Sequence, residues 1–164
     1  MNFPANNSPQ RVGEGVFCYI CSTMTTRIVP VAGKSAQIID AVMTSPDIPG
    51  DEALRYRIRL CTEEIIVNIV NYAYNNGNGF IEVSTHVDDE GILTISFKDA
   101  GVRFNPLDVE DPDITLGVDE RPVGGLGIFM CKKLMDSVNY EYSHGCNHFS
   151  MTINIKKDGS NDKQ

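Results

Sequence analysis

The amino-acid sequence predicts an α+β domain: a two-layer sandwich in which helices cover one face of a mixed, mostly antiparallel sheet. One observation is the order of the expected elements, which is strand, two helices, two strands, a long loop, one helix and two strands. Another is that the last two strand pairs are each joined by a short turn, and such hairpins run antiparallel. The helices must then bury their apolar faces against the sheet.

The strands are expected where β-branched and aromatic residues gather between turn-forming residues. Gly91 supplies the turn of the first hairpin, and His144, Gly145 and Cys146 join the strands of the second. The expected strands cover residues 16–28, 80–87, 92–98, 138–143 and 147–155.

Three helices are expected, over residues 32–43, 51–74 and 126–136. Asp51 is a suitable N-cap for the long second helix, because its side chain can accept a hydrogen bond from a free backbone N–H. The Asn- and Gly-rich segment 75–79 ends that helix, since these residues tolerate the left-handed backbone conformation.

The long helix carries polar residues beside its apolar face. At about 100° per residue, Glu64, Asn68 and Asn71 fall on one stripe, whereas Glu63 lies on the far side. Polar groups against a core cost free energy unless a cation, a water or a ligand pairs with them. We therefore expect this helix to form the floor of a ligand site. Its buried face is expected to contain Leu54, Ile58, Cys61, Ile65, Ile69 and Ala73.

The 164 residues suffice for one domain with a real core, expected over 15–156 between a polar segment 1–14 and a polar tail 157–164. Residues 105–123 contain three prolines and six acidic residues and lack periodicity. Such a long loop in a compact domain is typically a functional lid or disordered.

The net charge of -8, from 22 acidic and 14 basic residues, argues against nucleic acid as a direct partner, because phosphate binding needs a basic field. Five cysteines without a signal peptide indicate reduced thiols, and no stretch is apolar and long enough to span a membrane. We expect a cytoplasmic protein.

Two possible metal sites are disfavoured. Cys18 and Cys21 have a zinc-like spacing, but no second ligand pair follows, and in a strand their side chains would point to opposite faces. His144, Cys146 and His148 surround a turn, and nothing suggests a fourth ligand.

Three motifs remain as candidates for chemistry. Glu64 and Asn68 could serve as a proton acceptor and an oxygen ligand for Mg²⁺, although helices often expose such residues. Asp99-x-Gly101 could bind an amino group or a sugar hydroxyl, or form an ordinary turn. Gly124–Gly127 precedes a helix whose free N–H groups suit phosphate oxygens, but these glycines could also form a hinge.

In order and spacing, these motifs resemble the GHKL (Bergerat-fold) ATPase superfamily, and within it the RsbW-like anti-sigma-factor serine/threonine kinases. The segment Thr62–Asn68 with Tyr72-Ala73-Tyr74 matches the first conserved box of the family. Asp99–Phe104 matches the second box, and Gly125-Leu126-Gly127-Ile128 matches the third. The resemblance covers residues 15–156.

The resemblance implies a role for each matched residue. Asn68 would hold Mg²⁺ at the ATP phosphates and Glu64 would act as general base. Asp99 and Gly101 would bind adenine, and residues 105–123 would form the ATP lid. The phosphates would be contacted at Gly125, Leu126 and Gly127, with Arg121 as a weaker candidate for the γ-phosphate.

The resemblance also implies partners. ATP would phosphorylate a serine of a small anti-anti-sigma (STAS-domain) protein, and the chain would sequester a sigma factor or a similar regulator. A homodimer through the first strand and helix is implied as well. An ATP-binding partner-switching module without kinase activity is the alternative. The family's Gly-Thr near the last strand is absent here, so Ser150 or Thr152 is expected to supply the hydroxyl beside Asp99.

Overall fold

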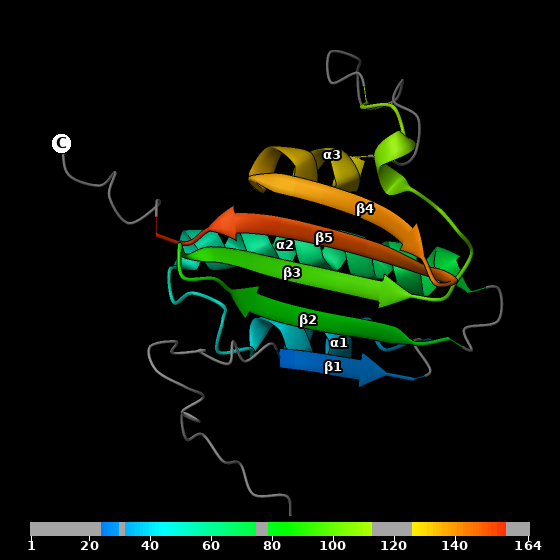
Figure 1. The fold of residues 1–164 in the computed structure, drawn as a ribbon, viewed down its shortest axis with the longest axis horizontal. Coiled ribbons are helices and arrows are strands. Elements are labelled where there is room, and N and C mark those ends of the chain that lie inside the picture. Colours follow the sequence, from blue (N-terminus) through cyan, green and yellow to red (C-terminus); the bar gives the residue numbers. More distant parts are fainter. Residues whose placement is uncertain (1–23, 30–31, 75–78, 113–125, 157–164) are drawn as a thin grey trace, which may run out of the picture.

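The computed structural model describes residues 24–29, 32–74, 79–112 and 126–156. It contains one five-stranded sheet whose strands lie in the order β1-β2-β3-β5-β4, and each neighbouring pair is antiparallel (Figure 1). β3 therefore pairs with β5, although 46 residues separate the end of one from the start of the other in sequence. The strands are β1 (Met24–Ile28), β2 (Ile81–Val87), β3 (Ile92–Asp99), β4 (Ser137–Ser143) and β5 (Cys146–Asn154).

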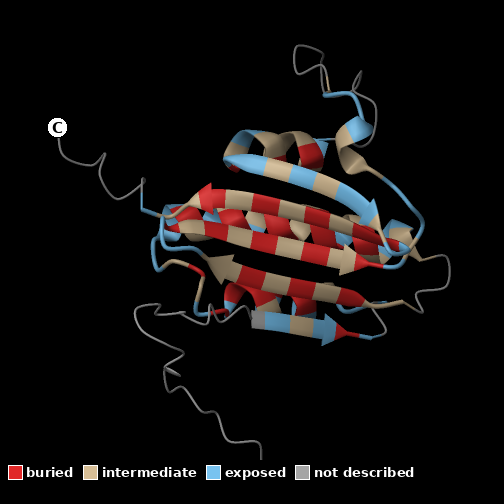
Figure 2. Cartoon of the chain, viewed as in Figure 1, coloured by how far each residue is buried: buried red, intermediate tan, exposed pale blue. Residues whose placement is uncertain are grey.

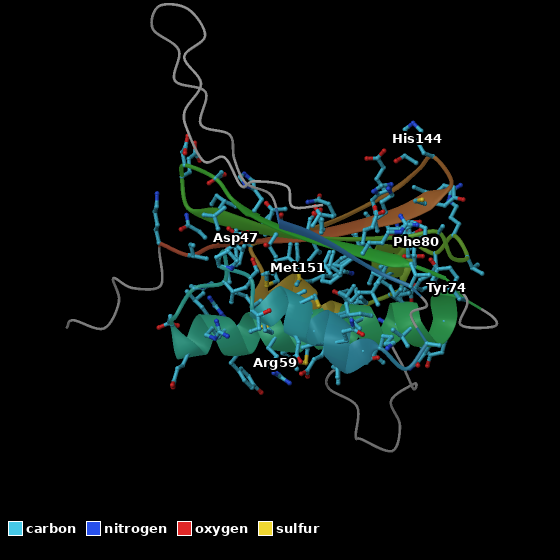
Figure 3. The ribbon with its side chains drawn as sticks, turned by 90° about the horizontal axis from the view of Figure 1, so that it is seen from below. Asp47, Arg59, Tyr74, Phe80, His144 and Met151 are labelled. Atoms are coloured by element: carbon cyan, nitrogen blue, oxygen red, sulfur yellow. The ribbon has the colours of Figure 1, made fainter. Side chains whose placement is uncertain are left out.

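The helices lie on one face of this sheet (Figure 3). α2 runs across the sheet and is flanked by α1 and α3, and Met151 of β5 points from the sheet toward this helical layer, whereas Arg59 of α2 lies on the side away from the sheet. The predicted α+β sandwich is thus confirmed. The α-helices are α1 (Ser35–Met43), α2 (Glu52–Asn68) and α3 (Leu126–Leu134), with a π-helical segment η1 (Ile69–Ala73) and a short 3-10 helix η2 (Pro106–Asp108).

The core lies between the two layers. Burial alternates along β2, β3 and β5 because successive side chains of a strand point to opposite faces (Figure 2). The inward residues pack against α1 and α2 in one continuous apolar cluster. Its fully buried side chains include Ile38, Leu54, Ile58, Ile66, Ile81, Leu93, Ile95, Phe97, Met151 and Ile153.

The expected elements and the observed ones agree closely. Asp51 caps α2, since its carboxylate accepts a hydrogen bond from the backbone N–H of Leu54 at 2.8 Å. Gly91 has φ +83°, which is the conformation expected of it in the first hairpin. Only residues 24–28 of the first expected strand are described, and residues 113–123 of the expected lid and both expected tails also lie outside the described residues. No helix within the described ranges is long and apolar enough to cross a membrane.

Candidate active site

The long helix changes character directly after Asn68. The sequence predicts a regular α-helix over 51–74, but the last turn, Ile69–Ala73, is π-helical. This wider turn brings the backbone of Ala73 to the end of β3, where its carbonyl accepts a hydrogen bond from the N–H of Val102 at 2.9 Å. A π-helical turn inside an α-helix is frequently found at a functional site.

Glu64 lies against the first turn of α3. A Cβ atom built on Gly127 would overlap the Glu64 carboxylate and would lie 2.6 Å from its carboxyl carbon. Only glycine therefore leaves room for this carboxylate at the start of α3. Asn68 follows one turn later on α2 and is half-buried. We call Glu64, Asn68 and Gly127 the Glu64 cluster.

The two adjacent glutamates are separated in space as well as in role. Glu63 forms an ion pair with Arg59, one turn earlier on α2, at 2.8 Å. Asn71 lies in the π-helical turn and is exposed. Of the polar stripe predicted on this helix, Glu64 and Asn68 are therefore the members that remain half-buried.

A second polar cluster lies where β3 and β5 end side by side. Asp99, which is 4% exposed, pairs with Asn147 across the two strands. Asp99 Oδ1 accepts hydrogen bonds from the backbone N–H of Gly101 at 2.8 Å and from Asn147 Nδ2 at 2.9 Å. We call Asp99, Gly101 and Asn147 the Asp99 cluster.

The buried position of Asp99 affects its ionisation. Burial raises the pKa of the Asp99 carboxyl above its ordinary value, because a charged carboxylate loses the solvation of water. The hydrogen bonds from Asn147 and Gly101 and the charge of His148 act in the opposite direction and lower this pKa. Burial is the larger effect, so the pKa of Asp99 stays above its ordinary value.

Gly101 lets two backbone segments meet. A Cβ atom on Gly101 would overlap the carbonyl of Ala73 and would lie 2.6 Å from the Ala73 side chain. The adjacent Tyr74 closes the same end of the molecule: its hydroxyl donates to the carbonyl of Phe80 at 2.7 Å and accepts from the N–H of Ala100 at 2.8 Å (Figure 3). The end of η1 and the end of β3 are therefore held together at the Asp99 cluster.

The structure does not bring the expected hydroxyl partner to Asp99. Ser150 pairs with Ser96 and Thr152 pairs with Thr94, on the face of the sheet that lacks helices, whereas Asp99 faces the helices. The Thr152 hydroxyl instead bonds to that of Ser137 on β4 at 2.8 Å. Thr152 therefore does not lie beside Asp99, because it is opposite Thr94 and on the other face of the sheet, and its expected role remains a prediction.

The remaining expected site residues lie beside the Glu64 cluster or outside the described ranges. Leu126 begins α3 and its side chain is exposed. Gly124, Gly125 and Arg121 lie outside the described residues. Their predicted roles remain predictions.

Asn147 and its partners were missed from the sequence. The Asn147 side chain is 6% exposed and also bonds to Tyr140 of β4 and to the chain that follows Gly101. One signal could have found it: in an antiparallel pair the residue opposite Asp99 shares its face, so the register of β3 and β5 names the partner. That register was not available from the local sequence.

The Glu64 cluster thus lies between α2 and α3, and the Asp99 cluster lies at the ends of β3 and β5. The chain belongs to the histidine kinase-like ATPase domain family, whose sequence model matches residues 34–153, from the start of α1 into β5. Both clusters lie within the matched region.

The chain is similar to the serine/threonine-protein kinase BtrW of Bordetella bronchiseptica, with 25% identity over 99 residues that cover 60% of this chain and 70% of BtrW. Its fold is similar to that of the RsbU and RsbW domains of Rv1364c from Mycobacterium tuberculosis, with a TM-score of 0.54 and 16% identity over 79% of this chain. It is also similar to the blue-light activated histidine kinase EL346 of Erythrobacter litoralis, with a TM-score of 0.52 and 18% identity over 78% of this chain. The chain spans 32% and 42% of these two longer chains, and at such identities the likeness concerns the fold.

Proposed function

We propose that this chain is a cytoplasmic, ATP-dependent serine/threonine protein kinase of the anti-sigma type. Its substrate would be a serine of a small anti-anti-sigma (STAS-domain) protein, and it would also sequester a sigma factor or a similar regulator. The observation that carries the proposal is the contact of Glu64 with Gly127, because it places a carboxylate beside the start of a helix whose free N–H groups suit phosphate oxygens. Family membership and the likeness to BtrW support it.

The residues fit the groups that such a reaction requires. The amide oxygen of Asn68 is a hard oxygen donor of the kind that Mg²⁺ prefers, and the Glu64 carboxylate lies one turn before it on α2. Gly127 has no side chain that would keep a phosphate from the helix backbone. Asp99 offers a buried acceptor for the amino group of adenine, and the N–H of Gly101 donates to its carboxylate.

Each residue then has a distinct role in the proposed reaction. Glu64 would accept the proton of the attacking serine hydroxyl, the amide oxygen of Asn68 would hold Mg²⁺, and Asp99 would orient the nucleotide through its base. Bound Mg²⁺ supplies neutralisation of the charge that develops on the phosphate oxygens. Most of the rate enhancement in phosphoryl transfer comes from such positioning and charge neutralisation.

Transfer of label from γ-labelled ATP to a purified STAS-domain protein tests the proposal, after a pull-down with and without ATP has identified the partner by mass spectrometry. We expect Mg-ATP to raise the unfolding midpoint, because a ligand of the folded state stabilises it by mass action. We also expect label on a serine of the partner. A midpoint that saturating Mg-ATP leaves unmoved would overturn nucleotide binding. ATP-dependent capture of the partner without transfer of label would favour a partner-switching module that is not a kinase.

A further inference from the structure

Cys61 and Cys131 form a pair of buried thiols between α2 and α3. Cys61 lies three residues before Glu64 on α2, and Cys131 lies four residues after Gly127 on α3. The Cys131 thiol donates a hydrogen bond to the backbone carbonyl of Cys61, with 3.8 Å between sulfur and oxygen. Both cysteines are free, and both are 0% exposed. The pair therefore lies one helical turn from the contact of Glu64 with Gly127, between the same two helices.

The two thiols differ in how readily they ionise. A thiolate at Cys61 accepts a hydrogen bond from the Cys131 thiol, and this bond lowers the pKa of Cys61 below its ordinary value, although burial and the charge of Glu64 raise it. The same hydrogen bond raises the pKa of Cys131, and burial acts in the same direction. Because the thiolate is the nucleophile, Cys61 is the sulfur that reacts first with an oxidant.

Access of a small oxidant to this pair depends on α3. Of the nine residues of this helix, Ile128 and Cys131 are the buried ones, so little apolar surface holds it in place. A segment with few buried apolar contacts opens locally at a lower free energy than the core of the protein does. Movement of α3 away from α2 would uncover both thiols, because they lie in the contact between these two helices.

We propose that Cys61 and Cys131 are a modification site for peroxides, and that the disulfide formed between them lowers phosphoryl transfer. This inference rests on the proposed kinase activity and adds to it a means of regulation.

The proposed oxidation has two steps. In the first, the Cys61 thiolate attacks one oxygen of hydrogen peroxide, the O–O bond breaks and a sulfenic acid forms, while the other oxygen leaves as water with the proton of the Cys61 thiol. In the second, the Cys131 sulfur attacks the Cys61 sulfur, an S–S bond forms, and the sulfenic hydroxyl leaves with the Cys131 proton as a second water. The two thiols lose two electrons in all, and the peroxide gains them.

The disulfide would act on the Glu64 cluster through the spacing of the two helices. An S–S bond of about 2.05 Å is shorter than any non-bonded contact between two sulfur atoms, so α2 and α3 are drawn together at this turn as the bond forms. Gly127 leaves no room for such a movement, because even one added Cβ atom there would overlap the Glu64 carboxylate. The carboxylate is therefore displaced, and a misplacement of about 1 Å can lower a rate by roughly 100-fold.

The test compares the full chain before and after treatment with hydrogen peroxide. Peptide mapping by mass spectrometry without reduction detects the disulfide, and transfer of label from γ-labelled ATP to the STAS-domain partner measures activity. We expect a linked peptide that contains Cys61 and Cys131 and a fall in transfer of roughly 10- to 100-fold. Reduction with dithiothreitol should break the bond and restore the rate measured before treatment.

Two substitutions separate this pair from the other thiols. Cys61→Ala removes the attacking sulfur, so this variant should form no linked peptide and keep its transfer rate under the same dose of peroxide. Cys146→Ala, at a buried free cysteine at the start of β5, is the matched control and should lose transfer as the wild type does. If Cys61→Ala does not fold, Cys131→Ala takes its place: it should form no linked peptide and should hold Cys61 as a sulfenic acid that dimedone traps.

The absence of a linked peptide in the treated wild type would overturn the inference. A linked peptide that forms without a fall in transfer would overturn it as well. Equal loss of transfer in Cys61→Ala and in the wild type would place the sensitive group elsewhere, with the same consequence. If the reduced wild type transfers no label at all, the proposed function itself fails. The peptide map still decides in that case whether the disulfide forms, so the two failures are distinguishable.

Discussion

The Glu64 cluster and the Asp99 cluster are built in different ways. Neither Glu64 nor Asn68 has a side-chain hydrogen bond to another residue in the part of the chain that the structure describes. Asp99 and Asn147, in contrast, belong to a closed network of hydrogen bonds that joins β3, β4 and β5. The Asp99 cluster is therefore already ordered by hydrogen bonds within the protein. The Glu64 cluster instead offers polar groups with which a ligand would pair.

This contrast fits the proposed chemistry. A base pocket gains affinity and specificity when its acceptor is fixed in advance, because no ordering remains for the ligand to impose. Groups that hold a metal ion and move a proton must change partners during the reaction, so saturating them in the protein would oppose their function. The glycines follow the same division: Gly127 faces a flexible side chain, whereas Gly101 faces backbone.

The largest effect is expected from a substitution in the Glu64 cluster. Glu64→Gln keeps the shape of the side chain but cannot accept a proton, so phosphoryl transfer should fall roughly 10²- to 10⁴-fold. Binding of Mg-ATP, measured by titration calorimetry, should change little, because the Asp99 cluster is intact. Glu63→Gln is the matched control, since Glu63 pairs with Arg59 on the surface, and it should transfer label at the wild-type rate. Transfer by Glu64→Gln equal to that of the wild type would remove Glu64 as the base.

Alanine at Gly127 and alanine at Gly101 should have different effects: the first should mainly lower phosphoryl transfer, and the second should mainly lower the free energy of unfolding. Gly127→Ala should displace the Glu64 carboxylate, which can swing away, so the free energy of unfolding should change by less than about 1 kcal/mol while transfer falls about 100-fold. Gly101→Ala meets the backbone of Ala73, which cannot swing away, and should lower the free energy of unfolding by roughly 1–3 kcal/mol. Urea denaturation and label transfer measure the two effects. Gly50→Ala, with open space around its Cβ position, is the control. Equal destabilisation by both glycine variants would contradict the distinction.

The smallest expected effect is on the pH dependence of stability, and it concerns the carboxyl group of the Asp99 cluster. Burial raises the pKa of Asp99 above that of the unfolded chain, so between the two pKa values the folded protein holds a proton that the unfolded chain has lost. The contribution of this carboxyl to stability is therefore present at acid pH and decreases as the pH rises through the folded pKa. Asp99→Asn removes the dependence, so the free energy of unfolding of the variant relative to the wild type should increase as the pH rises above about 4. Urea denaturation at several pH values measures this difference in the free energy of unfolding. A difference that stays constant or decreases with pH would show that folding does not raise the pKa of Asp99.

Local spacing in the sequence was enough to single out the residues of the candidate site, and the resemblance to a known family implied their roles. Glu64 and Asn68 were identified because they are four residues apart on an apolar helix, and Asp99 and Gly101 because they follow the last strand of a hairpin. These inferences need only the periods of a helix and a strand, which are properties of the chain itself. The π-helical turn after Asn68 was not predicted, because its wider winding depends on the contact of Ala73 with the end of β3.

Asn147 and Thr152 show where such inference ends. Both lie on β5, and from the sequence either could have been placed beside Asp99, which lies 48 residues before Asn147. Their places are decided by the register between β3 and β5, in which Asn147 lies opposite Asp99 and Thr152 lies opposite Thr94 on the other face of the sheet. The residues near Asp99 in the sequence do not determine that register, because it depends on how two distant strands pair.

The sequence by itself determined the order of the elements, the fold class, the polar stripe of α2 and the glycines of the two clusters, since each depends on short-range periodicity and turn chemistry. The tertiary structure alone decided that Glu64 meets Gly127, that Ala73 meets Gly101 and that Asn147 holds Asp99. These contacts join segments 28 to 63 residues apart, and their geometry follows from how the helices and strands pack around the shared core.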